Sequence, residues 1–281
     1  MRVVRTIAFL VVVGVIGAVA IAIWRGAGPL PDPEGCSATV AGHHVSIDTG
    51  QGEVATLIAA IAMERGMPAR AVSIALATGF QESKLRNLRG GDRDSLGIFQ
   101  QRPSQGWGTR SQILTPTYAI NAFYDALEKV DGYETMRITD AAQRVQRSGY
   151  PEAYEPHAPD ARALASALTG YSAGGRFSCV VHDTKNTGTA AAVIESLRTG
   201  YGSRVIANSA GRQDVVVTVA SGAAGHRMGW SMAQYLVGHA NALNIRGLSF
   251  DHRAWHIGRA SEKGWTKSSD ASSDQITVSL G

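Results

Sequence analysis

The sequence predicts a mainly α-helical protein, with a helical domain after an N-terminal transmembrane segment and a small α+β domain at the end. Three observations support this prediction. Residues 6–24 contain no charged side chain. Apolar residues recur at helical spacing through residues 53–169, without strand-like alternation. The β-branched run at 214–219 is typical of a strand and begins the expected α+β region.

The N-terminus is expected to insert into a membrane. The uncharged stretch 6–24 approaches the ~20 residues that a helix needs to cross the hydrocarbon layer. Arg2 and Arg5 precede it, so the positive-inside rule places the following domains outside the cytoplasm. Apolar residues up to Ile23 favour an uncleaved anchor, while an A-x-A sequence ending at Ala20 permits signal-peptide cleavage. We expect a single-pass cell-membrane protein with extracellular domains, or a secreted protein if Ala20 is the cleavage point.

Composition suits a packed globular protein with an anionic partner. Hydrophobic residues make up 44% of the chain and charged residues 18%, which is enough apolar material for a core. The formal net charge is +4 and the sequence pI is about 9.2. Because no run of Lys and Arg is present, an anionic envelope polymer fits better than nucleic acid.

The chain has two cysteines, Cys36 and Cys179. An even count in an exported chain favours a disulfide, because the compartment is oxidising. Such a bridge would join the segment entering the helical domain to the segment leaving it. The alternative is two unpaired buried thiols.

Shifts in composition divide the chain into five segments. We expect a transmembrane anchor or signal segment at 1–25, a Pro/Gly-rich spacer at 26–49, a helical domain at 50–180, a linker at 181–210 and a small α+β domain at 211–281.

The helical domain is expected to hold five helices around one long loop. The expected helices span 53–65, 69–83, 116–130, 139–147 and 160–169. Gly66 ends the first, Pro68 can open the second, and Thr115-Pro116 supplies an N-cap and an N1 proline. Residues 87–108 form the loop, and a loop of this length in a compact domain is usually functional or disordered.

The C-terminal elements are shorter. A short helix is expected at 191–197 and a longer one at 231–243. Strands are expected at 214–219, 245–255 and 275–280, from their β-branched and alternating residues.

The end of the second helix carries the candidate catalytic residue, Glu82. At 100° per residue, Glu82 lies about 20° from Ala75 and so borders the apolar stripe of this helix. Apolar surroundings disfavour a charged carboxylate and raise its pKa. A carboxyl of this kind suits a general acid that protonates a glycosidic oxygen.

The loop after Glu82 contains residue types that bind sugars. Gln100 and Gln101 offer amides that both donate and accept hydrogen bonds. Trp107 offers a flat apolar face for a pyranose ring, and several glycines let the backbone approach a ligand.

Glu82-Ser83, followed by Leu96-Gly97-Ile98-Phe99-Gln100, resembles the lysozyme-like soluble lytic transglycosylase family. That family has a Glu-Ser pair at a helix end, then a Gly-Leu-Met-Gln-type motif and an Ala-Tyr-Asn motif. Here Ala153-Tyr154 is followed by Glu155 instead of Asn. The resemblance implies that Tyr154, with Tyr150 in reserve, hydrogen-bonds the catalytic glutamate. Ser83, Gln100, Gln101 and Trp107 would then contact the substrate.

The resemblance covers residues 50–170 and implies a glycosidase that cuts peptidoglycan strands, with no cofactor and no metal. The family uses one glutamate as acid and then as base, and the product is an anhydro sugar. Ordinary glycosidases use two carboxylates. Asp92 and Asp94 could supply the second one, and water would then be the nucleophile, as in a muramidase.

The C-terminal region resembles small domains attached to actinobacterial cell-wall hydrolases, through Trp230, Trp255 and Trp265. We expect a wall or protein partner for it, although tryptophans in so small a domain are more often core. The altered third motif favours an alternative function, a catalytically silent peptidoglycan-binding or scaffold protein.

Overall fold

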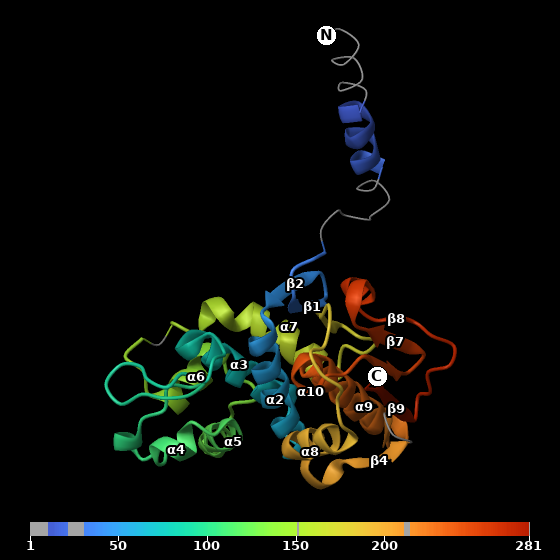
Figure 1. Cartoon of the computed structure of the whole chain (residues 1–281). Helices are drawn as coiled ribbons and strands as arrows, with labels where there is room; N and C mark the ends of the chain where they lie inside the picture. The colour runs from blue at the N-terminus through green and yellow to red at the C-terminus, as the bar shows by residue number, and fades with distance from the viewer. Residues whose placement is uncertain (1–10, 22–30, 151, 211–213, 281) are drawn as a thin grey trace, which may run out of the picture. The chain divides into compact units, whose positions relative to one another are not determined.

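The computed structural model describes residues 11–21, 31–150, 152–210 and 214–280. The chain divides into two compact units, Met1–Pro33 and Glu34–Gly281. Figure 1 shows the elements of the second unit, which holds both sheets and all the labelled helices.

The predicted membrane anchor is wrong on the evidence of the structure. Residues 11–21 are helical. In the parts of the chain that the structure describes, no helix is long and apolar enough to cross a membrane. The remaining residues of the expected span, 6–10 and 22–24, lie outside the described residues. The expected single-pass localisation is therefore corrected.

The second unit begins with a strand hairpin, where a structureless spacer was expected. Strands β1 (Gly35–Val40) and β2 (His43–Ile47) pair in antiparallel fashion, and β1 also pairs with β3 (Phe177–Val180). Ala41 and Gly42 make the connecting turn, both with positive φ. The order of this sheet is β2-β1-β3.

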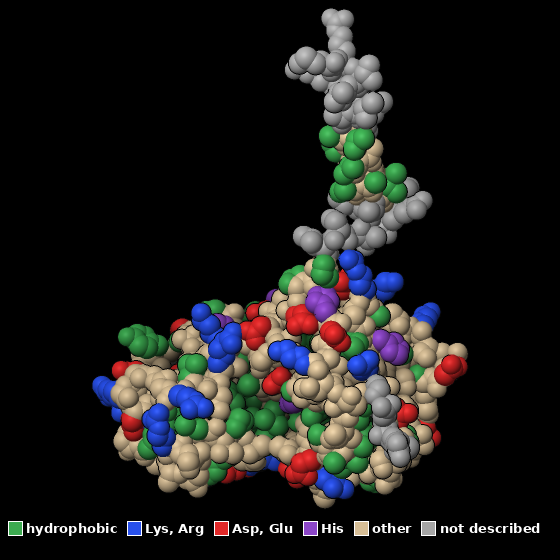
Figure 2. Space-filling view, in the orientation of Figure 1, with side chains coloured by type: hydrophobic (Ala, Val, Ile, Leu, Met, Phe, Trp, Pro, Cys, Tyr) green, Lys and Arg blue, Asp and Glu red, His purple; other side chains and the backbone are tan. Residues whose placement is uncertain are grey.

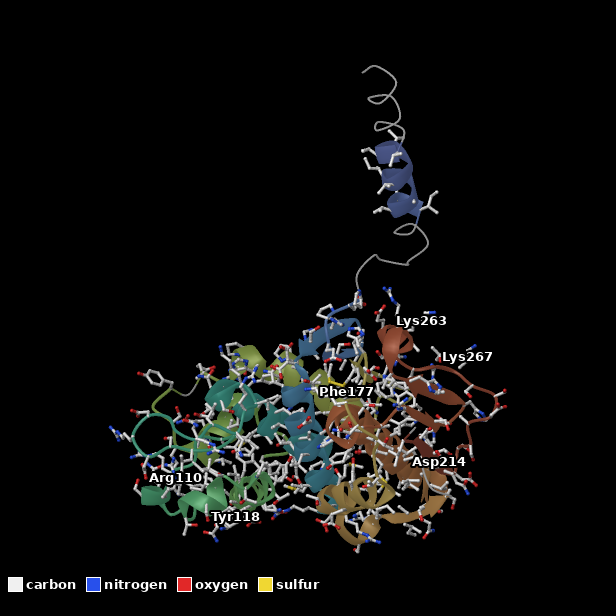
Figure 3. All side chains as sticks on the ribbon, viewed as in Figure 1. Arg110, Tyr118, Phe177, Asp214, Lys263 and Lys267 are labelled. Atoms are coloured by element: carbon white, nitrogen blue, oxygen red, sulfur yellow. A yellow bond between two sulfur atoms is a disulfide. The ribbon has the colours of Figure 1, made fainter. Side chains whose placement is uncertain are left out.

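The predicted pairing of the cysteines is confirmed. Cys36 lies opposite Cys179 in the β1–β3 register, and the two form a disulfide with an S–S distance of 2.06 Å. Figure 3 shows this bond beside Phe177. The bridge joins residues 143 positions apart in the sequence.

The expected helices between the cysteines are present. They are α2 (Thr49–Glu64), α3 (Ala69–Ser83), α5 (Pro116–Leu127), α6 (Ile138–Gln146) and α7 (Ala158–Leu168). The short helix α4 (Arg110–Ile113) and the 3-10 turns η1 (Pro103–Gln105) and η2 (Glu155–His157) were not expected. A capping box formed by Asp48 and Gln51 starts α2 earlier than expected, because the Asp48 carboxylate accepts from the Gln51 N–H.

Residues after β3 form a helical layer and a second sheet. The helices are α8 (Ala190–Tyr201), α9 (Gly222–Gly238) and α10 (Ala240–Leu243), with 3-10 turns η3 (Gly202–Arg204) and η4 (Gly258–Lys263). The strands are β4 (Ile206–Ala210), β5 (Asp214–Thr218), β6 (Gly247–Phe250), β7 (Arg253–His256), β8 (Thr266–Lys267) and β9 (Gln275–Ser279). They form an antiparallel sheet in the order β4-β5-β9-β6-β7-β8.

The fold is therefore α+β, and the expectation of a mainly α protein is wrong. The described residues form two antiparallel sheets, of three and six strands. Strands β5 and β9 match the expected strands at 214–219 and 275–280, but β1, β2, β3 and β4 lie where no strand was expected.

One hydrophobic core runs through the second unit. Helix α2 packs against α3, α5 and α7 and also against α8 and α9. The tryptophans of the C-terminal region belong to this core. The indoles of Trp255 and Trp265 donate to the carbonyls of Cys179 and Phe177, which satisfies the free edge of β3. Their burial gives no support to a ligand-facing role.

Candidate active site

Glu82 lies in the last turn of α3 and is partly buried. Lys84 ends the helix in the left-handed conformation, with φ of 55°. The chain then reverses so closely that a Cβ at Gly79 would lie 2.7 Å from Leu85 Cδ2. Gly79 therefore allows Leu85 to pack back onto α3 and fixes where the helix ends.

Tyr154 is the direct partner of Glu82. Its hydroxyl donates a hydrogen bond of 2.8 Å to Glu82 Oε1, and its side chain is completely buried just before η2. Burial, followed by the negative charge of Glu82 and this hydrogen bond, raises the pKa of Tyr154 far above its usual value. The phenol thus remains a donor, and it holds the carboxylate in one orientation.

The two tyrosines suggested by the sequence differ in burial: Tyr154 is buried and Tyr150 is exposed. Tyr150 is 78% exposed, and its backbone N–H donates to Ser148 Oγ. Glu155, at the position where the resemblance implies an asparagine, forms an ion pair of 3.5 Å with Arg137. The altered third motif thus keeps its tyrosine at the glutamate, while Glu155 is paired with another side chain.

Ser83 joins α3 to the loop that contains the second motif. The Ser83 hydroxyl, which is buried, donates to the carbonyl of Ile98 at 2.6 Å and accepts from the N–H of Arg86. This places Ser83 in the support of the site, beneath the loop. We expected Ser83 to contact the substrate, but its hydroxyl is buried and bonded to backbone groups of the protein.

Close packing and a buried hydrogen bond fix the conformation of the Gly97–Gln101 turn. A Cβ at Gly97, where φ is +75°, would lie 2.8 Å from the carbonyl of Ile113. Gln101 is buried, and its Nε2 donates to the carbonyl of Ala119, so it supports the turn. Gln100 is partly exposed, and its amide donates to the carbonyl of Gly97. Of the two glutamines, Gln100 is the one available to a ligand.

Gln146 is a supporting residue that the sequence analysis missed. It lies at the end of α6 and donates to the carbonyl of Phe99 at 2.8 Å, which joins this helix to the motif loop. Neither its residue type nor its spacing from Glu82 distinguishes it from a surface glutamine. Only the approach of α6 to the loop reveals its role.

The two loop aspartates occupy different surroundings. Asp94 accepts from Arg102 Nε at 2.8 Å and from the backbone and hydroxyl of Ser104. The Arg102 hydrogen bond, with those from Ser104, holds the pKa of Asp94 well below its usual range. The Asp92 side chain is 93% exposed. Within the described part of the chain, neither forms a hydrogen bond or ion pair with Glu82.

Trp107 faces a separate cavity between α5 and α6. That cavity is about 690 Å³, and neither Glu82 nor Tyr154 is among its lining residues. Figure 2 shows the visible face hollowed between the region of α3 to α6 and the region of α8 to α10, with hydrophobic side chains on the floor. Glu82 therefore lies with Tyr154 and Ser83, whereas Trp107 lines the cavity between α5 and α6.

Glu53 is a second carboxyl with unusual surroundings that the sequence analysis did not single out. It is partly buried on α2, and burial raises its pKa. It lies one turn before Thr56, whose hydroxyl is 3.3 Å from Nδ1 of His239 on the chain after α9.

Comparison with known proteins adds no relative: the chain matches no protein-family model, and a search of curated proteins finds no match.

Proposed function

We propose that this protein is a glycosidase that cleaves peptidoglycan glycan strands, with Glu82 as its acid and base. The observation that carries the proposal is the hydrogen bond from Tyr154 to Glu82. A buried phenol that holds a carboxylate at a helix end is the arrangement that the resemblance to lytic transglycosylases implies.

The chemistry requires one proton carrier. Glu82 in its acid form gives its proton to the glycosidic oxygen as the bond to the sugar C1 breaks. The resulting carboxylate then removes the proton from a hydroxyl of the same sugar, whose oxygen forms a new bond to C1. Proton and charge balance, and the product is an anhydro sugar. Tyr154 keeps Oε1 of Glu82 in place through both steps.

The surroundings of Asp94 support this intramolecular route over one that uses Asp94 as a second carboxylate. Asp94 is engaged by Arg102 and Ser104, so its oxygens already hold three hydrogen bonds. A hydrolytic route would need a carboxylate free to activate water on the far side of the sugar. Asp92 remains the candidate for a muramidase outcome.

The charge of the motif region also suits peptidoglycan, whose stem peptides carry carboxylates. Exposed cations follow Glu82 along the chain; they are Lys84, Arg86, Arg89, Arg93 and Arg110. Arg110, labelled in Figure 3, is the first residue of α4. The disulfide is consistent with an oxidising compartment, where such polymers occur.

The alternative is a catalytically silent peptidoglycan-binding or scaffold protein. One observation favours it: Glu155, at the position of the family's asparagine, is paired with Arg137 and offers no amide to a sugar. In this proposal the region after residue 210 would recruit the wall or a protein partner.

The test is mass spectrometry of purified peptidoglycan incubated with the full chain and with Glu82→Gln. Anhydro-muropeptides from the unmodified protein alone would establish the transglycosylase. Glu195→Gln, an exposed glutamate on α8, is the matched control and should give the unmodified pattern. Reducing-end products would point to hydrolysis. No product from any variant, with strand binding retained, would overturn the enzyme proposal in favour of the scaffold.

A further inference from the structure

Neither Glu82 nor Tyr154 lines the cavity that Trp107 faces. It lies between α5 and α6, and the loop that contains η1 forms one side of it. Its volume of about 690 Å³ falls within the range of small-molecule sites. Its lining residues combine two aromatic rings with three cationic side chains.

The aromatic side of the cavity is formed by Trp107 and Tyr118. Both side chains are partly buried, and Trp107 packs against the core. Gly108 allows the loop to approach Tyr118: its φ is +125°, and a Cβ there would lie 2.5 Å from the Tyr118 hydroxyl. This close approach holds the two aromatic residues at one cavity, where a sugar ring can stack on an aromatic face.

The other side of the cavity is cationic. Lys129 follows α5, Arg144 lies in the last turn of α6, and Arg147 caps α6 with φ of 51°. All three are exposed, and none forms an ion pair with any other residue that the structure describes. The carboxyl ends of α5 and α6 favour cations, so the dipoles help these like charges to gather.

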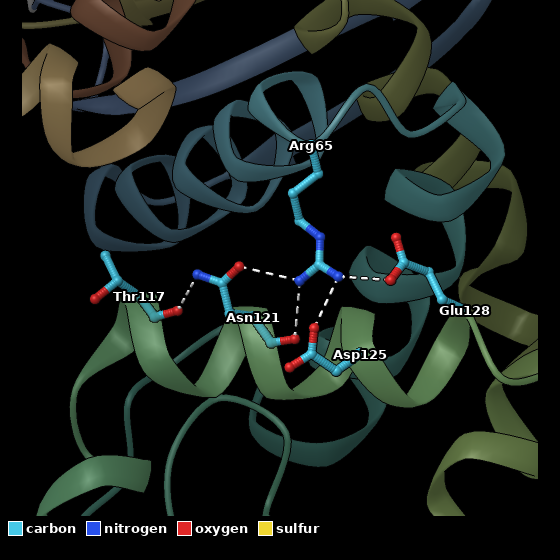
Figure 4. A network of polar contacts seen from close by, with 5 residues as sticks. All are labelled: Arg65, Thr117, Asn121, Asp125 and Glu128. Atoms are coloured by element: carbon cyan, nitrogen blue, oxygen red, sulfur yellow. Dashed lines mark hydrogen bonds and ion pairs between the residues drawn. The ribbon is translucent and has the colours of Figure 1, made fainter. Parts of the chain in front are cut away.

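Two acidic residues near this group, Asp125 and Glu128, are held by Arg65 on α2. Arg65 Nη2 is 2.8 Å from Asp125 Oδ1 and 2.7 Å from Glu128 Oε2 (Figure 4). Asp125 is the one acid among the described residues that line the cavity. Because Arg65 binds both carboxylates, the cavity keeps an excess of positive charge.

We propose that this cavity binds an acidic sugar unit of a glycan strand. The ring lies against Trp107 and Tyr118, and its carboxylate accepts hydrogen bonds from Arg144 and Arg147, with Lys129 nearby. In peptidoglycan, this unit is muramic acid that has lost its stem peptide, because only then is its lactyl carboxyl ionised. The inference rests on the proposed function, since it takes glycan strands as the ligand.

The test measures binding without cleavage. The full chain carrying Glu82→Gln is titrated calorimetrically with glycan strands freed of stem peptides, and with the same strands after their carboxyls are converted to neutral amides. We expect the carboxylate strands to bind at least about ten-fold more tightly, as charge-assisted hydrogen bonds predict. Arg144→Gln with Arg147→Gln should remove that difference, and Trp107→Ala should weaken binding of both strands.

Arg198→Gln is the matched control, because Arg198 is an exposed arginine in the last turn of α8, away from the cavity. It should keep the full preference, and circular dichroism should show that each variant is folded. Equal affinity for the two strands, no binding of either, or an equal loss with Arg198→Gln would overturn the inference. Failure of the cleavage assay leaves this readout intact, so the two proposals can fail separately.

Discussion

The Tyr154 hydroxyl and the Glu82 carboxylate lie 72 residues apart in the sequence and 2.8 Å apart in the structure. The bond joins the end of α3 to the segment just before η2. Because the tyrosine is buried and the glutamate only partly so, the phenol is the fixed partner and the carboxylate is the one that can face a substrate.

Replacing Tyr154 with Phe tests this relationship. The change removes one hydrogen bond to a carboxylate and keeps the ring. Such bonds contribute ~1.5–3 kcal/mol, so kcat for peptidoglycan cleavage should fall about ten-fold or more. Tyr150→Phe, at an exposed position, should leave kcat unchanged. An unaltered kcat in Tyr154→Phe would show that the bond does not position Glu82 for the reaction.

Replacing Asp94 tests whether this aspartate supports the loop or takes part in the reaction. Asp94→Asn removes the charge held by Arg102, and it should loosen the loop and lower the melting temperature without changing the type of product. Because the pKa of Asp94 is lowered on folding, its contribution to stability is present above its unfolded value near 3.8 and is lost as the pH falls further. Mass spectrometry would contradict us if Asp94→Asn abolished one product class.

His239 should make stability depend on pH. Burial lowers its pKa from 6.5 to about 4, and the ring stacks on Tyr235 with centroids 4.0 Å apart. Between these values the unfolded chain binds more protons than the folded one, so stability should rise from pH 4 to 6.5 and level off above. The full shift corresponds to about 3 kcal/mol.

The measurement is denaturant unfolding at pH 5 and pH 7 for the unmodified protein and His239→Gln. Taking the difference between the two proteins cancels other groups, including Glu53, whose raised pKa acts in the opposite direction. An identical pH dependence in both would rule out His239 as the source.

Trp255→Phe should destabilise the protein by ~1–3 kcal/mol. Its indole N–H is the donor to the Cys179 carbonyl at 3.0 Å, and phenylalanine would leave that buried acceptor unpaired. Urea unfolding measures the loss. Trp107→Phe is the comparison, because the structure records no hydrogen bond from its indole to a described residue, and an equal loss there would argue against the edge-capping role of Trp255.

Sequence reasoning predicted the helices between the cysteines well. Helix α3 has the predicted bounds, and α5, α6 and α7 lie within two or three residues of expectation. It was less successful for the strands. The strands expected at 214–219 and 275–280 match β5 and β9, and the short helix expected at 191–197 matches α8, but β1 and β2 fall in the expected spacer. The alternation of Cys36, Ser37, Ala38 and Thr39 was present, but Pro and Gly nearby obscured it.

The sequence by itself determined where most of the helices lie, that Cys36 and Cys179 form a natural pair, and that Glu82 ends a helix before a Gly-x-x-Gln turn. These features depend on local periodicity, caps and residue counts. Tertiary structure alone decided that Tyr154 meets Glu82 while Tyr150 does not, that Asp94 is engaged by Arg102, and that Trp107 faces another cavity. Those outcomes depend on contacts between segments distant in the chain, where burial and a partner's charge, absent from any local pattern, decide what a side chain can do.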